Sequence, residues 1–168
     1  MEETLPNGIV VEKGHGTYKF YYKPLYNSTN KKNTRKKRTY KCYLHVNQGL
    51  SSSLHISDFD CTGRKKGGGD GKKMLCASFN YLREELGLDD DTLVTLTAMA
   101  VRDRPAQEKL NEYFTRTYGF QVIGEMDHLF RTDMSTNIGT IIDKCAISEM
   151  PQRLTWHRGG TMKKRKRL

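Results

Sequence analysis

A loop rich in glycine and lysine stands between a strand-like and a helix-like segment. Residues 61–71 read CTGRKKGGGDG; they follow the strand-like Ser53–Cys61 and precede the helix-like Lys72–Leu86. Glycines allow backbone N–H groups to converge on one point, and a helix N-terminus adds a partial positive charge. We therefore expect an anion-binding site here, of the kind that holds a pyrophosphate.

Two common phosphate-binding patterns do not describe this loop. The P-loop pattern GxxxxGK[ST] requires a Ser or Thr after the lysine, whereas Lys73 follows Gly71-Lys72. The dinucleotide pattern GxGxxG is not met in order either. Countercharge for an anion is available from four lysines around the loop: Lys65, Lys66, Lys72 and Lys73. The alternative interpretation, a surface loop without a ligand, stays open at this point.

The positive charge of the chain is concentrated in two runs. The 168 residues include 29 Lys and Arg against 19 Asp and Glu, for a formal net charge of +10. Six of these positive charges fall within residues 31–38 and five within 163–167, which leaves the rest close to neutral. Such runs stay solvated, and they contact polyanions, direct nuclear import or only keep a protein soluble.

Length and composition favour one domain with a core. Hydrophobic residues make up 36% of the chain, which is polar for a globular protein but sufficient for a core. We expect a single domain over residues 1–150, with a basic loop at 27–38 and a basic tail at 151–168. No apolar run approaches the roughly 18 residues that span a bilayer, and no signal peptide precedes the first strand. Neither a membrane protein nor a secreted one is expected.

The four cysteines suggest neither a metal site nor a disulfide framework. Cys42, Cys61, Cys76 and Cys145 form no CxxC pair, so the usual ligand spacing of a zinc site is missing. Four cysteines in a chain of this length are ordinary for a reducing compartment. We therefore expect mostly buried free thiols, no metal and a cytoplasmic or nuclear location.

The order of predicted elements indicates an α+β fold (α/β-like) with a mixed sheet. A hairpin, a strand after the basic loop and another strand precede the glycine-rich loop; an uncharged strand, a helix closed by Gly119 and a final hairpin follow the first helix. The strands are expected at 8–13, 17–22, 39–46, 53–61, 92–100, 121–125 and 129–133, and the helices at 72–86 and 106–118. After Met134 the pattern weakens.

Two segments resemble the GNAT superfamily of acyl-CoA N-acyltransferases. Ile56, Asp58, Phe59 and Cys61, then Lys66-x-x-Gly69-x-Gly71 and Met74-Leu75, resemble the family's motif A, in which a strand precedes (Gln/Arg)-x-x-Gly-x-(Gly/Ala) and a helix. The segment LNEYFTRTYGFQVIGE, with Gly119-Phe120 at a helix–strand junction, is similar to the second family segment. The resemblance covers Leu54 to about Met134, roughly half of the chain.

The resemblance implies a GNAT-type mixed sheet flanked by helices and transfer of an acetyl group from acetyl-CoA to a primary amine. The amine, a protein lysine or a small polyamine, would attack the thioester directly. Lys66 stands where the family has Gln or Arg, and Asp70 puts a carboxylate inside the expected pyrophosphate turn. The residues that the resemblance assigns to acetyl-CoA are Phe59, Asp60, Cys61, Lys66, Gly67, Gly68, Gly69, Asp70, Gly71 and Lys72.

Candidates for proton transfer come from the strand before the loop and the helix before Gly119. The strand offers His55, Asp58 and Asp60 as candidate general bases, and Glu125 lies near the final hairpin. Histidine is the common general base near neutral pH, and His55 and Asp58 are the two candidates assigned to catalysis. Strict alternation predicts that Asp58 and Asp60 share a face with Ile56, opposite His55. The family often has a tyrosine where Thr115 stands, and Tyr118, one turn further along, is the candidate acid.

A second hypothesis needs no catalysis. The runs at 31–38 and 163–167 could contact nucleic acid or chromatin. An aromatic cluster could stack bases, namely Tyr18, Phe20, Tyr21, Tyr22 and Tyr26. The chain would then be a nucleic-acid-binding module. Affinity that falls steeply with ionic strength and vanishes without both runs would distinguish it from the enzyme.

Overall fold

The computed structural model describes residues 1–22, 42–61, 70–100 and 103–147. The loop 27–38, the tail 151–168 and the glycine-rich residues 62–69 lie outside these ranges. The elements in chain order are β1 (Glu2–Thr4), β2 (Ile9–Lys13), β3 (Thr17–Tyr22), β4 (Cys42–Gln48), η1 (Leu50–Ser52), β5 (Leu54–Cys61), α1 (Asp70–Leu86), β6 (Leu93–Met99), α2 (Arg104–Tyr118), β7 (Gln121–Ile123), β8 (Arg131–Asn137) and α3 (Ile138–Ile147).

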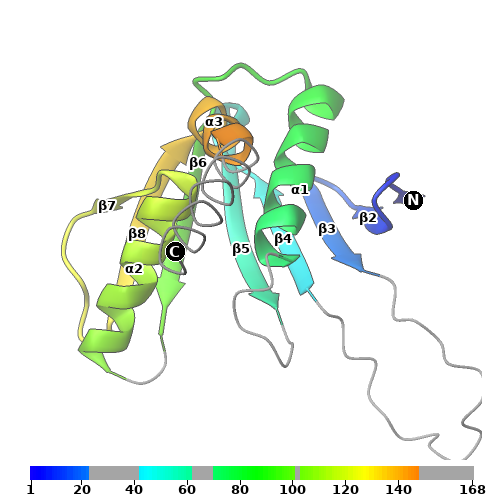
Figure 1. Cartoon of the computed structure of the whole chain (residues 1–168). Coiled ribbons are helices and arrows are strands. Elements are labelled where there is room, and N and C mark those ends of the chain that lie inside the picture. Colours follow the sequence, from blue (N-terminus) through cyan, green and yellow to red (C-terminus); the bar gives the residue numbers. More distant parts are fainter. Residues whose placement is uncertain (23–41, 62–69, 101–102, 148–168) are drawn as a thin grey trace, which may run out of the picture.

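The strands form one sheet of eight in the order β1-β2-β3-β4-β5-β6-β8-β7. Among the described residues, β5 and β6 form the one parallel pair, and every other neighbouring pair is antiparallel. The crossover between β5 and β6 is α1, as a parallel connection requires (Figure 1). The expected α+β fold with a mixed sheet flanked by helices is therefore confirmed.

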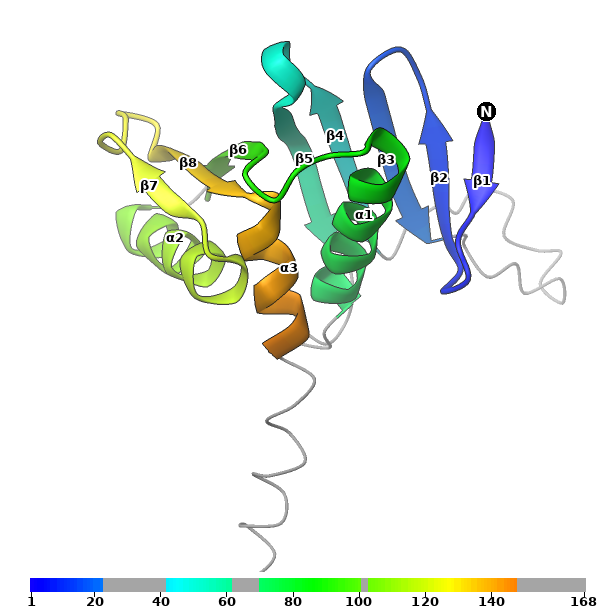
Figure 2. The ribbon, with the colours of Figure 1, turned by 90° about the horizontal axis from the view of Figure 1, so that it is seen from above.

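The three helices cover one face of the sheet. Figure 2 shows α1, α2 and α3 on the same side of the strands. On that side the buried residues of β3, β4 and β5, such as Phe20, Leu44 and Ile56, pack with Leu75 and Phe79 of α1 in one core cluster. The opposite face, from β2 to β5, carries polar and aromatic side chains. We call it the open face.

The ends of α2 follow from its sequence. Asp103 is the N-cap and accepts a hydrogen bond from the N–H of Ala106 at 2.9 Å, and Pro105 occupies the first turn. Gly119 ends the helix in the left-handed region at φ +79°. A Cβ there would come within 2.4 Å of Thr140 of α3, so the position requires glycine for both its conformation and its packing.

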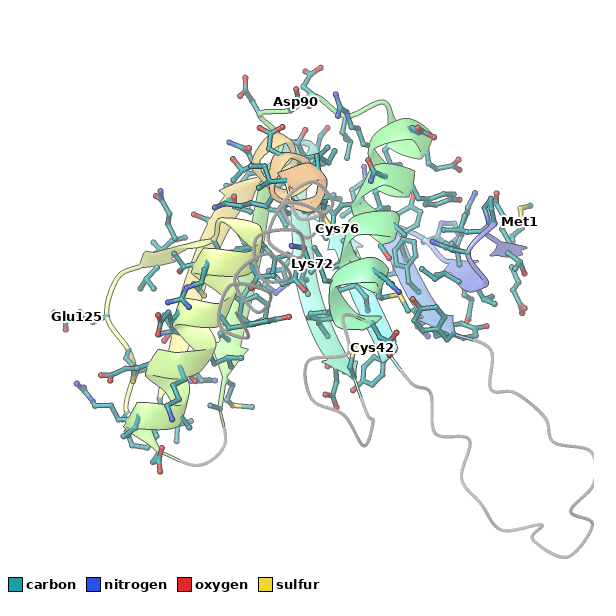
Figure 3. The ribbon with its side chains drawn as sticks, viewed as in Figure 1. Met1, Cys42, Lys72, Cys76, Asp90 and Glu125 are labelled. Carbon is teal, nitrogen blue, oxygen red and sulfur yellow. A yellow bond between two sulfur atoms is a disulfide. The ribbon has the colours of Figure 1, made fainter. Side chains whose placement is uncertain are left out.

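The expectation of free thiols is wrong. Cys42 and Cys61 form a disulfide between the ends of β4 and β5, and Cys76 and Cys145 form another between α1 and α3; Figure 3 labels Cys42 and Cys76. The antiparallel register sets Cys42 directly opposite Cys61, with Cα atoms 4.0 Å apart. Spacing in the sequence does not show such a register, which is why the pairing was missed. The cytoplasmic or nuclear location, which was inferred from the expectation of free thiols, stays a prediction.

Two elements have no counterpart among the expected ones. β1 is short and fully exposed, and α3 follows β8 where the pattern was expected to weaken. The apolar residues of α3 recur at Ile138, Ile141 and Ile142 with helical spacing, but Gly139 and the short length hide the period. The last strand begins two residues later and ends four residues later than expected. No helix in the described part is long and apolar enough to cross a membrane.

Candidate active site

β5 and β6 are paired for part of their length and then diverge. Residues 54–56 of β5 pair with residues 94–96 of β6. β5 continues to Cys61, paired with β4, and β6 continues to Met99, paired with β8. Between the described residues of β5 and β6 no further pair forms, and Figure 1 shows the two ribbons moving apart. Each strand therefore presents a backbone edge without a strand partner, which can bind an extended chain that carries amides.

A β-bulge at Ser57 determines which side chains line this divergence. The register between β4 and β5 shifts here, so that Ser57 has no counterpart on β4. The extra residue reverses the alternation. Phe59 consequently packs on the core side with Ile56, whereas Asp58 and Asp60 are exposed on the open face. The expectation that the two carboxylates share a face with Ile56 is wrong for this reason.

A glutamine of α2 occupies the edge of β6 beyond the last β5 pair. Gln107 is fully buried; its Nε2 donates to the carbonyl of Ala98 at 3.1 Å, and its Oε1 accepts from the N–H of Ala100 at 2.6 Å. In a parallel pair of strands, one residue makes the same two hydrogen bonds to the adjacent strand. Its N–H donates to the carbonyl of one residue there, and its carbonyl accepts from the N–H of the residue two positions later. Nε2 also donates to Asn111 at 2.7 Å. Gln107 was not predicted from the sequence, because nothing in a helical pattern distinguishes a glutamine that bonds to a strand.

The first turn of α1 packs on the end of β5. An added Cβ at Gly71 would lie 3.2 Å from Sγ of Cys61 and 3.4 Å from Cζ of Phe59. Phe59 in turn faces Phe114 of α2, with ring centroids 6.5 Å apart. The N-terminus of α1, the unpaired edge of β5 and one side of α2 thus meet around the divergence. These are the parts that an acyl group on a long, phosphate-bearing carrier needs: an edge for amides and a positive helix end for phosphate.

Six of the ten residues assigned to acetyl-CoA lie in the described part. Phe59, Asp60 and Cys61 end β5, and Asp70, Gly71 and Lys72 begin α1. The other four lie outside the described residues: Lys66, Gly67, Gly68 and Gly69. Within the described part, the two ends of the glycine-rich loop are close, as the contact between Gly71 and Cys61 shows. Asp60, however, is exposed on the open face, away from Phe59.

His55 lies on the open face beside β6. Its Nδ1 is 2.8 Å from Oγ1 of Thr95, the residue directly opposite it on β6. His55 precedes the bulge, whereas Asp58 follows it, so the two candidate bases occupy different positions along β5. Asp58 is the one that lies in the diverging part of the strand.

Tyr118 is fully buried at the end of α2. Its hydroxyl lies 3.1 Å from that of Tyr113, and its ring packs against those of Tyr113 and Phe114. Burial is the main cause that raises the pKa of Tyr118 far above its ordinary value, with a smaller contribution from Tyr113. Tyr113 is half-exposed, so it is the group through which Tyr118 would exchange a proton with solvent. The role of Tyr118 as an acid stays a prediction.

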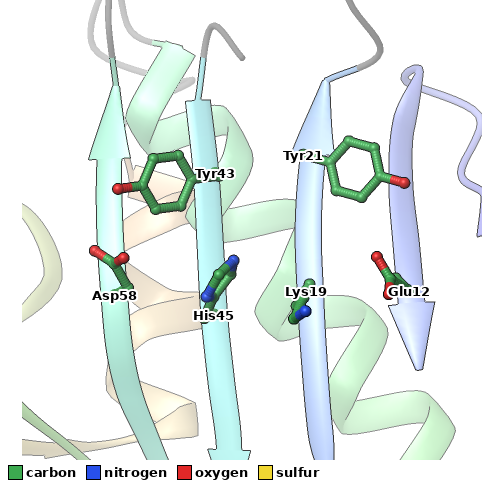
Figure 4. Close-up of a pocket in the computed structure, with 6 residues that line it drawn as sticks. All are labelled: Glu12, Lys19, Tyr21, Tyr43, His45 and Asp58. Carbon is green, nitrogen blue, oxygen red and sulfur yellow. The ribbon is translucent and has the colours of Figure 1, made fainter. Parts of the chain in front are cut away.

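The open face carries a pocket of about 410 Å³. It is lined by Glu12, Lys19, Tyr21, Tyr43, His45 and Asp58 (Figure 4). Burial raises the pKa of Tyr43 above its ordinary value, and the negative charges of Asp58 and Asp60 raise it further. A site on this face was not predicted from the sequence, because its lining residues come from four separate strands. In the described part no group of three or more His, Cys, Asp or Glu side chains is arranged to hold a metal ion.

No family model and no curated protein matches the chain, but solved structures are similar to it over about three quarters of its length. An acyl-CoA N-acyltransferase from Pseudomonas aeruginosa is 19% identical, with a TM-score of 0.49 over 73% of this chain and 68% of that one. A Bacillus anthracis protein assigned as a streptothricin acetyltransferase, solved with acetyl coenzyme A, is 10% identical, with a TM-score of 0.47 over 74% of this chain and 64% of that one. A spermidine N-acetyltransferase chimera from Vibrio cholerae and hSSAT is 12% identical, with a TM-score of 0.47 over 76% and 70%. Of these three neighbours, one is an acyltransferase and two are acetyltransferases.

Proposed function

We propose that the protein is an N-acetyltransferase that transfers an acetyl group from acetyl-CoA to a primary amine. The observation that carries this proposal is the divergence of β5 and β6 beyond residues 56 and 96, with the N-terminus of α1 at its open end. The helix end suits the pyrophosphate, and the unpaired edge of β5 suits the amide-bearing arm of the donor.

The residues around the divergence fit the donor. Lys72 and the other lysines near the glycine-rich loop supply countercharge, and the backbone of residues 59–61 would pair with the arm and orient the thioester. Phe59 and Phe114 form an apolar wall that excludes water from the reacting atoms. Asp70 is the one feature of this end that opposes an anion.

Direct attack on the thioester requires a neutral amine and a leaving thiolate. The amine nitrogen forms a bond to the acetyl carbon, the carbon–sulfur bond breaks, and the electron pair leaves with the sulfur. Asp58, in the diverging part of β5, is placed to accept the proton that the ammonium gives up, with His55 as the other candidate. Tyr118 would act on the sulfur side by way of Tyr113, and solvent can protonate the thiolate in their place.

The test is turnover. Purified protein is incubated with acetyl-CoA and a panel of amines, namely a lysine-containing peptide, a diamine and a monoamine. Free thiol and acetylated amine should then appear in equal amounts. Asp58→Asn should lower kcat/KM about a hundredfold if Asp58 is the base, whereas Asp133→Asn on β8 serves as a matched control. The absence of thiol release with every amine would contradict the proposal.

The nucleic-acid hypothesis is not adopted. It rests on the basic runs at residues 31–38 and 163–167, which lie outside the described residues, so it stays a prediction. The open face itself presents Glu12, Asp58 and Asp60, and carboxylates repel a phosphate backbone.

A further inference from the structure

We propose that the pocket on the open face binds the acceptor, and that the acceptor is a linear diamine or polyamine held at both ends. The reaction of this acceptor rests on the proposed function, but its binding does not. Three features of the pocket support this: the register of its strands, the balance of its charges and the positions of its two tyrosines.

The strand register sets the lining residues in two parallel rows. Glu12 lies opposite Lys19, Lys19 opposite His45, and His45 opposite Asp58, so that one row crosses β2, β3, β4 and β5. Neighbouring strands are about 4.8 Å apart, and the ends of this row are therefore about 14 Å apart.

The second row supplies aromatic rings. Tyr21 lies opposite Tyr43, and Tyr43 opposite Asp60. Figure 4 shows the hydroxyl of Tyr43 directed toward β5, which carries Asp58, and that of Tyr21 directed toward β2, which carries Glu12. Each end of the pocket thus combines one tyrosine with one carboxylate. A ring face and a carboxylate together favour an organic cation.

The charge of the pocket also favours a cation. Glu12 and Asp58 line the pocket with two carboxylates, and Lys19 lines it with one ammonium. Neither carboxylate forms a salt bridge with a described residue. A ligand with two separated positive charges satisfies both ends, whereas an anion or a nucleic acid would meet the carboxylates. The volume of about 410 Å³ is within the range of small-molecule sites.

The two ends have different tasks. Asp58 belongs to the diverging part of β5, so the nitrogen bound there is the one next to the donor. Glu12, on β2, is remote from the divergence and anchors the second nitrogen. Lys19 lies beside Glu12 and competes with that nitrogen for the carboxylate. Lys19 therefore weakens binding of a long dication.

Binding is measured by calorimetry on the full chain without a donor. The probes are α,ω-diamines from a three-carbon to a ten-carbon chain, with hexylamine as the single-charge control. Affinity should rise with chain length, since only the longer diamines reach both ends. Glu12→Gln should weaken the long diamines about fivefold and leave hexylamine unchanged, and Lys19→Gln should tighten them by a similar factor. A gain in affinity is an effect that misfolding does not produce.

The outcomes separate this proposal from the proposed function. The proposed diamine site would be contradicted if long diamines bind no better than hexylamine. It would also be contradicted if the Lys19→Gln variant binds them more weakly. Transfer to amines with no change in KM for diamines in Glu12→Gln would also overturn it, while the enzymatic function would stand. Diamine binding with the expected pattern but without any acetyl transfer would support the diamine site and contradict the proposed acetyltransferase activity.

Discussion

Asp70 is a carboxylate at the helix end where a phosphate is expected. It is the first residue of α1, where a negative charge stabilises the helix through the dipole and repels a bound anion. Asp70→Asn should therefore raise the affinity for acetyl-CoA about two- to fivefold and lower the melting temperature slightly. Calorimetric titration measures the affinity, with Asp89→Asn in the exposed turn after α1 as the control. A lower affinity in Asp70→Asn would show that this carboxylate assists binding.

Asp127 gives a pH dependence of stability with a definite sign. Its carboxylate accepts hydrogen bonds from the N–H groups of Leu129 and Arg131, both at 2.9 Å, and from Nε of Arg131 at 2.7 Å. The bond from the Arg131 backbone is the main cause that lowers the pKa of Asp127 below 3.8. Because its pKa is lowered in the folded protein, the ionised carboxylate stabilises the fold at pH values above the ordinary pKa of an aspartate. This stabilisation is lost as the pH falls through the folded pKa.

Asp127→Asn should consequently lower the melting temperature at neutral pH. The difference from the wild type should shrink as the pH falls from the ordinary pKa of an aspartate through the lower pKa of Asp127 in the folded protein. Thermal unfolding followed by circular dichroism at a series of pH values measures this. A difference that is independent of pH would mean that the charge of Asp127 contributes nothing.

Among the elements, α2 keeps β6 in its diverging position through Gln107. Gln107→Met keeps the length of the side chain but leaves the carbonyl of Ala98 and the N–H of Ala100 without this partner. The cost should be roughly 1–3 kcal/mol in the free energy of unfolding. Amide exchange at Ala100 should also become faster. Glu108→Met, an exposed neighbour on α2, is the matched control, and equal stability of the two variants would contradict this role.

The sequence predicted most elements because their signals are local. The strands β2, β3 and β5 and the helix α2 lie within a residue or two of the expected bounds, since alternation, Pro105 and Gly119 are read directly. The bulge at Ser57 and the two disulfides depend on how distant strands and helices meet. Local sequence patterns do not show those contacts. The side of the sheet on which Asp58 lies was predicted wrongly for that reason.

The site was predicted in part. The helix after the glycine-rich loop begins two residues before its expected start and ends where expected, whereas residues 62–69 of the loop lie outside the described residues. The pocket was not predicted, because it gathers single residues from four strands whose register only the fold determines. Gln107 is a similar case, since its partners lie on β6 and not on its own helix.

The molecule as a whole is a two-layer structure with different chemistry on its two sides. The helices cover one face of the sheet and bring the N-terminus of α1 to the divergence of β5 and β6. The other face is polar and holds the pocket. β5 belongs to both, because the bulge directs Phe59 to one side and Asp58 to the other. The proposed donor and acceptor would therefore reach β5 from opposite faces of the sheet.

The charge of the whole chain leads to a separate prediction. Because the basic runs at 31–38 and 163–167 hold eleven of the positive charges, replacing them with Gln and Ser should abolish binding to heparin at low salt. Acetyl-CoA binding should stay within about twofold, because the proposed donor site would use residues of β5 and α1 at short range. A large loss of acetyl-CoA affinity would show that the runs belong to the donor site.

The proposed donor site is tested most directly by hydrogen exchange with and without acetyl-CoA. We predict that the donor slows exchange in residues 57–61 of β5 and in the first turn of α1, and that Gly71→Val, which crowds Cys61 and Phe59, abolishes the effect. The tightly paired strands β2 and β3 should not change. An absence of binding at millimolar acetyl-CoA, or protection confined to other segments, would contradict the assignment of the β5–β6 divergence as the acyl donor site.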